Sequence, residues 1–221
     1  MARVPLSVFA LDGPVVRGET GALWVSYLAA RGVAAPSLVA RLALVSVLDR
    51  RGVPLDLDRL AHEVMAPFRG LPLAGMERAL DGFVVNRLLP AVRPEAHRAM
   101  EELRTRGHRV VVATSAIAPI AERLARHLPV DGWIAPELAP SDDGRFAGAL
   151  AGPVTVGGAR RHALERLAGR RWPSWRLARV YGDRDSDAEL MGDAEEPVAV
   201  NPAEPFKSVA ERRGWPVVEW A

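Results

Sequence analysis

The 221-residue chain contains no cysteine, and its 29 basic residues include a single lysine, Lys207. The missing cysteine excludes a disulfide framework and a thiolate-bound metal. No apolar run approaches the roughly 18 residues that a membrane-spanning helix needs. The short apolar run from Val4 to Leu11 ends at Asp12, too early for a signal peptide. We therefore expect a cytoplasmic protein with no membrane partner.

Positive charge is not concentrated anywhere along the chain. The formal net charge is only +2, and no dense block of arginines is interleaved with aromatic residues. A nucleic-acid partner is therefore not expected. Hydrophobic residues make up 49% of the chain, close to an average globular protein, so it can bury its own core. Composition leaves the oligomeric state open.

After Pro94, short β-branched apolar runs alternate with helical patterns. This alternation predicts an α/β fold with a mostly parallel sheet. The expected strands are residues 4–11, 109–113, 132–135, 177–181, 198–200 and 217–220, with 145–150 as one arm of a hairpin. The expected helices are residues 95–106, 117–128, 160–170, 186–191 and 205–213.

Between Gly18 and Pro90 the apolar residues follow a helical period throughout, as in Leu38, Leu42 and Val45. The pattern predicts four or more amphipathic helices and no strand. We interpret this stretch as an insertion after the first strand. The expected domains are a core of residues 1–16 and 92–221 and a helical cap of residues 17–91.

Polar residues follow three of the expected strands. Asp12 follows the first, Thr114 and Ser115 follow Val110–Ala113, and a loop with Asp183 and Asp187 follows Tyr181. Ligands of parallel sheets bind beyond the carboxyl ends of the strands. Carboxylates without cysteine suit a hard cation such as Mg²⁺, and a hydroxyl before a helix suits a phosphate. The alternative is that each aspartate only caps a helix or a turn.

These segments resemble the motifs of the haloacid dehalogenase superfamily, and most closely the subfamily that contains phosphoserine phosphatase. The first motif matches Phe9 to Val15, the second Val111 to Thr114, and the fourth Gly182-Asp183 with Asp187. The resemblance covers essentially the whole chain. It implies a Rossmann-like core, a helical cap, a phosphatase-type activity and a bound Mg²⁺.

The chain departs from the family pattern at three motif positions. Ala10 stands where the family has the aspartate that forms an aspartyl-phosphate and ligates Mg²⁺. A methyl group can do neither. Pro14 replaces a threonine, and an arginine, Arg160 or else Arg161, replaces the phosphate-binding lysine. Ala10 is either natural or a substitution, and the sequence leaves both readings open.

The resemblance assigns roles to the carboxylates that remain. Asp12 would be the general acid/base, with its backbone carbonyl as a metal ligand. Asp183 would bind the metal directly, and Asp187 would position a metal-bound water or hold Arg160. With Ala10 in place of an aspartate, we expect Mg²⁺ affinity to be weakened or absent.

The resemblance also assigns an anion site and a substrate contact. Thr114, Ser115 and Arg160 would bind a phosphate or another anion. Glu19 stands where phosphoserine phosphatases contact the substrate ammonium, although a glutamate in the first turn of a helix is also favoured by the helix dipole.

Three functional hypotheses follow. The first is a phosphatase-like protein that binds or transforms an anionic small molecule without hydrolysing phosphate esters. The second is a non-catalytic binding or scaffold protein. The third is a phosphoserine-type phosphatase whose nucleophile has been replaced by Ala10.

Overall fold

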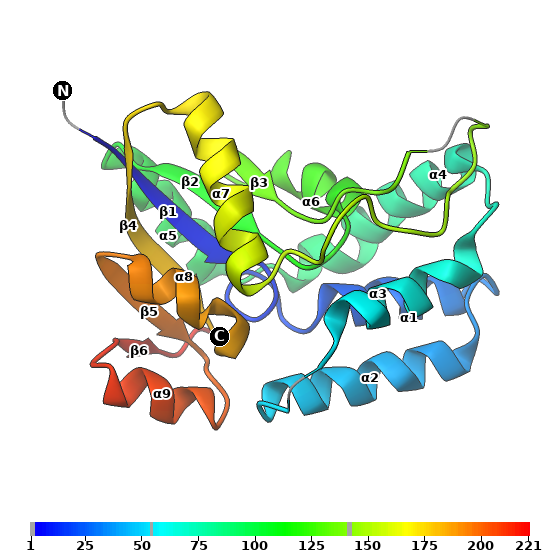
Figure 1. The fold of residues 1–221 in the computed structure, drawn as a ribbon, viewed down its shortest axis with the longest axis horizontal. Coiled ribbons are helices and arrows are strands. Elements are labelled where there is room, and N and C mark those ends of the chain that lie inside the picture. The colour runs from blue at the N-terminus through cyan, green and yellow to red at the C-terminus, as the bar shows by residue number, and fades with distance from the viewer. Residues whose placement is uncertain (1–2, 54, 141–142) are drawn as a thin grey trace.

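The computed structural model describes residues 3–53, 55–140 and 143–221. A six-stranded sheet with strand order β3-β2-β1-β4-β5-β6 forms its centre (Figure 1), and every strand pair in it is parallel. The predicted α/β fold with a mostly parallel sheet is confirmed. The strands are β1 Val4–Ala10, β2 Arg109–Ala113, β3 Gly132–Ile134, β4 Trp175–Gly182, β5 Glu196–Val200 and β6 Val217–Val218.

Helices cover both faces of the sheet, with α7 and α8 on one face and α5 on the other in Figure 1. Both faces of the sheet need a cover because successive side chains of a strand such as β1 point to opposite faces and are mostly apolar on both. Val8 packs in the same core as Leu164 of α7, whereas Phe9 packs with Met100 of α5. These helices are α5 Pro94–Thr105, α6 Ala118–Ala125, α7 Gly157–Arg171, α8 Ala188–Asp193 and α9 Phe206–Arg212.

In the described part of the chain, four α-helices lie between β1 and α5 in sequence and beside the sheet in space (Figure 1), and we call them the inserted helices. They are α1 Thr20–Ala29, α2 Pro36–Arg50, α3 Leu57–Met65 and α4 Leu73–Phe83. Trp24 and Tyr27 of α1 stack on each other, and Phe83 of α4 meets both rings edge to face, which joins α1 to α4. The helical character predicted for this stretch is confirmed, whereas the division into two domains stays a prediction.

The longest helices, α2 and α7, have 15 residues each. A helix that spans a bilayer needs about 20 predominantly apolar residues. In the part of the chain that the structure describes, no helix has the length and apolar character to cross a membrane.

The hairpin arm predicted at residues 145–150 is not a strand. Arg145 forms an isolated bridge with Pro72, and Leu150 forms another with Leu138. Gly148 between them has a φ of 72°, outside the extended region, so it interrupts any regular ladder. The segment is therefore a loop that packs against the inserted part of the chain, near Arg69.

Candidate functional site

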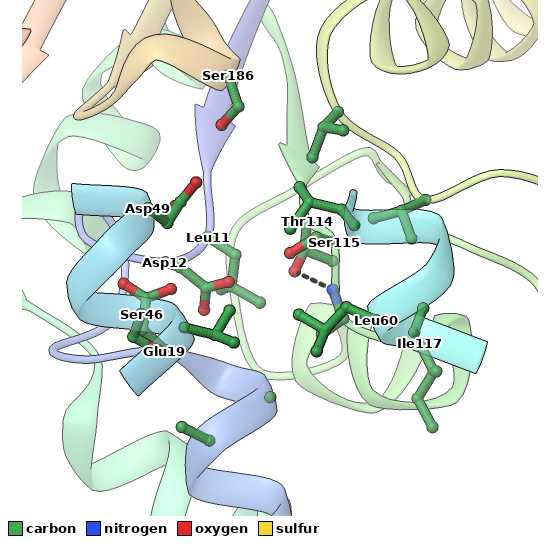
Figure 2. Close-up of a pocket in the computed structure, with 18 of the residues that line it drawn as sticks. Leu11, Asp12, Glu19, Ser46, Asp49, Leu60, Thr114, Ser115, Ile117 and Ser186 are labelled. Atoms are coloured by element: carbon green, nitrogen blue, oxygen red, sulfur yellow. Dashed lines mark hydrogen bonds between the residues drawn. The ribbon is translucent and has the colours of Figure 1, made fainter. Parts of the chain in front are cut away.

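A cavity of about 190 Å³ lies between the carboxyl edge of the sheet and the inserted helices. Residues that follow β1 and β2 line it together with residues of α1, α2 and α3 (Figure 2). Because β2, β1 and β4 are neighbours and parallel, the segments after them meet at this edge. The predicted site residues that line the cavity are Asp12, Glu19, Thr114, Ser115, Arg160 and Asp187.

The end of β1 presents a methyl group and a carboxylate to the cavity. Ala10, the last residue of β1, is buried and lines the cavity. Asp12 accepts hydrogen bonds from the backbone N–H of Thr20, at 2.7 Å, and from the Thr20 hydroxyl. Since Thr20 is the first residue of α1, the Asp12 carboxylate lies at the start of that helix. Burial, together with the Glu19 carboxylate, raises the pKa of Asp12 to about 6. Asp12 can therefore take up and release a proton near neutral pH.

Two hydroxyl residues follow β2 and lie across the cavity from Asp12 (Figure 2). Thr114 is buried, and its side-chain oxygen accepts a hydrogen bond of 2.9 Å from the backbone N–H of Ala116. Ser115 is exposed and lines the cavity. Its hydroxyl can both donate to and accept from a bound molecule.

Arg160, near the start of α7, forms a buried ion pair with Asp187. Its Nε also donates to the carbonyl of Thr155, at 3.2 Å. The second oxygen of Asp187 accepts from the backbone N–H of Asp183, at 3.0 Å. Arg161, the alternative left open by the sequence, points outward and pairs with residues on the protein surface. Of the two arginines, Arg160 is the one that reaches the cavity.

The most extensive ion-pair network of the site is centred on Arg184. Its Nε and Nη2 bind the two oxygens of Asp183, each at 3.0 Å. Nη2 and Nη1 also bind Glu19, at 2.9 and 3.0 Å, and Nη1 binds Asp49 at 3.0 Å. These five bonds use every N–H that a guanidinium has. The network therefore joins the loop after β4 to helix α2 and to the segment before α1.

The same network sets the protonation of its members. Burial raises the pKa of Asp183 to about 7, although the Arg184 guanidinium opposes this shift. Burial acts to lower the pKa of Arg184, but Asp183 and Glu19 outweigh it and hold that pKa above its ordinary value. Arg184 therefore stays charged at every physiological pH.

Arg184, Asp49 and Thr20 are site residues that the sequence did not single out. A signal for Arg184 exists, since it is the one base inside the acidic loop from Asp183 to Asp187. No sequence signal identifies Asp49, because it lies on helix α2, far from the motifs in sequence. Glu19, expected to meet a substrate, is bound instead by Arg184 and by Arg50, at 3.3 Å.

The carboxylates of the site do not fit a magnesium ion. Mg²⁺ needs oxygen ligands in a near-ideal octahedron. Ala10 supplies none, both oxygens of Asp183 are bound by Arg184, and both oxygens of Asp187 are hydrogen-bonded. Within residues 3–53, 55–140 and 143–221, no three acidic, histidine or cysteine side chains converge as a metal-binding group. The described residues therefore provide no preformed site for a magnesium ion.

Solved structures of similar fold support the α/β assignment. A protein of unknown function from Bordetella pertussis Tohama I superposes with a TM-score of 0.84 over 98% of this chain and 99% of its own, at 21% identity. A phosphoserine phosphatase bearing an analogue of the phospho-aspartyl intermediate superposes with a TM-score of 0.70 over 94% of this chain and 91% of its own, at 18% identity.

Two relatives found by sequence are named as phosphatases. A protein named histidinol-phosphatase from Neisseria meningitidis is 22% identical over 97% of this chain and 98% of its own length. A phosphoserine phosphatase of Mycobacterium tuberculosis is 31% identical over 50% of this chain, but over only 36% of its own length. The profile of the haloacid dehalogenase-like hydrolases matches residues 8–192. The chain belongs to the haloacid dehalogenase-like hydrolase family.

Proposed function

We propose that this family member binds a small molecule in the cavity and does not hydrolyse phosphate esters through an aspartyl-phosphate. The observation that carries this proposal is the methyl group of Ala10, which lines the cavity at the end of β1. That position is the one the family motif gives to the nucleophile. A hydrocarbon side chain offers no electron pair for attack on phosphorus.

The surrounding groups support the same function. Arg184 engages both oxygens of Asp183, so Mg²⁺ binds weakly or not at all. Pro14 has no N–H to offer a phosphate. Residues 17–91 act as a cap over a core of residues 1–16 and 92–221. A cavity between that cap and the core favours small-molecule binding over a purely scaffolding role.

A second candidate function is a phosphomonoesterase in which Ala10 replaces a natural aspartate. The observation that favours it is the likeness, along nearly the whole chain, to the Neisseria protein named histidinol-phosphatase. In that case Asp12 would serve as the general acid/base once a nucleophile is restored. The two candidates make opposite predictions for the variant Ala10→Asp.

The test is phosphate release from para-nitrophenyl phosphate, phosphoserine and histidinol phosphate, with MgCl₂ present. We expect no release by the native chain and none by Ala10→Asp, because Arg184 and Pro14 remain. Ala10→Asn is the matched control, since it has nearly the same size as aspartate but no nucleophilic carboxylate. All three proteins are compared at equal folded fraction by circular dichroism.

Two results would overturn the proposed function. One is metal-dependent hydrolysis by the native chain that Asp12→Asn abolishes. The other is robust hydrolysis by Ala10→Asp but not by Ala10→Asn. The second would show that the machinery is intact apart from one side chain.

A further inference from the structure

The walls of the cavity are mostly aliphatic, which sets the size and polarity of its occupant. Side chains from α2, α3 and the segments facing them supply these walls, among them Leu42, Val45, Leu60, Val64, Ile117 and Val154. A cavity of roughly 150 Å³ with such walls holds a benzene molecule. The cavity of about 190 Å³ therefore has room for one ring with a short side arm.

The two arginines of the cavity are already bound to carboxylates. Arg160 is paired with Asp187, and Arg184 uses all of its N–H groups on Asp183, Glu19 and Asp49. A phosphate would have to displace one of these carboxylates and leave it buried without its partner. Separating a buried ion pair in this way is costly.

The carboxylate of Asp12 differs from the other acidic groups of the cavity. Its Oδ1 accepts from the backbone N–H and the hydroxyl of Thr20, both neutral groups. Among the ion pairs of the described residues, none includes Asp12. An anionic ligand would be repelled by this carboxylate, whereas an ammonium would be attracted to it.

We propose that the cavity binds a small amine: one ring-sized apolar body in the aliphatic part, with its ammonium on Asp12. Ser115, which lies across the cavity from Asp12 in Figure 2, accepts a second hydrogen bond from the same ammonium. This inference rests on the proposed function, since it names the ligand class of the same cavity. It replaces the anionic ligand that the motifs suggest.

Calorimetric titration with three probes of one shape tests the inference: 2-phenylethylamine, 2-phenylethanol and 2-phenylethyl phosphate. The amine is expected to bind at least tenfold more tightly than the phosphate ester, with the alcohol between them. In Asp12→Asn the amine should lose its advantage over the alcohol. Because asparagine can still accept from Thr20, this variant should keep the native fold.

A cavity-filling variant checks where the probes bind. Leu60→Trp should abolish binding of all three probes, because Leu60 lines the cavity (Figure 2). Leu44→Trp is its control, since Leu44 is 58% exposed on the neighbouring helix α2, and it should bind like the native chain. Thermal melts of both variants establish that they are folded.

Several outcomes would overturn the inference. They are tighter binding of the phosphate ester than of the amine, no binding of the amine, or amine binding that Asp12→Asn or Leu60→Trp leaves unchanged. The phosphate probe also separates the two proposals. Tighter binding of the phosphate ester than of the amine, without phosphate release, contradicts only the ligand class, whereas hydrolysis of the ester contradicts the proposed function.

Discussion

The Arg184 guanidinium and the Asp183 carboxylate lie edge to edge, with Nε–Oδ1 and Nη2–Oδ2 distances of 3.0 Å each. This paired geometry is stronger and more directional than a single contact between charges. The opposite side of the same guanidinium holds Glu19 and Asp49. One cation therefore connects the loop after β4 with the inserted helices.

Replacing Arg184 with alanine should destabilise the protein by about 3–5 kcal/mol, because three partly or fully buried carboxylates would lose their shared cation. Urea unfolding followed by circular dichroism measures this loss. Amide hydrogen exchange should rise in α1 and α2 before it rises in the sheet. The stability of Arg184→Lys should lie between those of the native chain and Arg184→Ala, since an ammonium keeps the charge but cannot reproduce the planar guanidinium.

Arg126→Ala is the control for this prediction. Arg126 pairs with Glu122 four residues earlier, and their side chains are 65% and 49% exposed. A pair of this kind contributes at most about 0.5 kcal/mol. Equal losses in the two variants would contradict the role of Arg184 as the connection between sheet and inserted helices.

Magnesium should leave the melting temperature of the native chain unchanged. A ligand that binds only the folded state stabilises it by about 2.7 kcal/mol at a hundred times its dissociation constant. Native melts with MgCl₂ and with NaCl of equal ionic strength should therefore coincide. The double variant Ala10→Asp/Arg184→Ser restores one carboxylate and frees Asp183, so its melting temperature should rise with MgCl₂.

Each single variant of this pair serves as a control, and each should respond less than the double variant. Stabilisation of the native chain by MgCl₂ beyond the salt-matched sample would show that the ion displaces Arg184 from Asp183. That result would contradict the proposed loss of metal affinity.

Much of the fold could be predicted from the sequence because its strands are short and rich in β-branched residues. Val110 to Val112 are all buried within β2, and a strand buried on both faces is expected to carry an apolar run without alternation. The same reasoning fails at Arg145 to Leu150. This segment is predicted to be one arm of a hairpin, but Gly148 takes a positive φ and the segment packs against Arg69.

The sequence could predict only those parts of the site that lie at the ends of neighbouring strands. The residues after β1 and β2 line one cavity because those strands are neighbours, which the motifs anticipate. The partners of Arg184 could not be predicted, since Glu19 and Asp49 lie 165 and 135 residues away in sequence. Such pairings depend on how the inserted helices pack, which no local pattern encodes.

Gly13→Ala should destabilise the protein by at least about 2 kcal/mol, because φ at Gly13 is 89° and a left-handed backbone disfavours a side chain. A methyl group there would also lie 2.3 Å from Oδ2 of Asp183. Gly75→Ala is the control. Gly75 lies within α4 with open space around it, so alanine should stabilise by about 0.5–1 kcal/mol. Similar effects of the two substitutions in urea unfolding would contradict the prediction.

His108 should make the protein less stable in mild acid. Its Nδ1 lies 2.8 Å from the buried Ser7 hydroxyl, and burial, with Arg179 and Arg176 nearby, lowers its pKa below 6.5. The folded state then holds fewer protons than the unfolded state, so stability falls as pH drops through 6.5 toward the folded pKa. The measurement is the unfolding free energy between pH 8 and pH 5, and in His108→Gln it should change less with pH than in the native chain. His127→Gln is the control, because His127 is exposed and the substitution adds the same amide. An unchanged slope in His108→Gln would show that other groups cause the acid sensitivity.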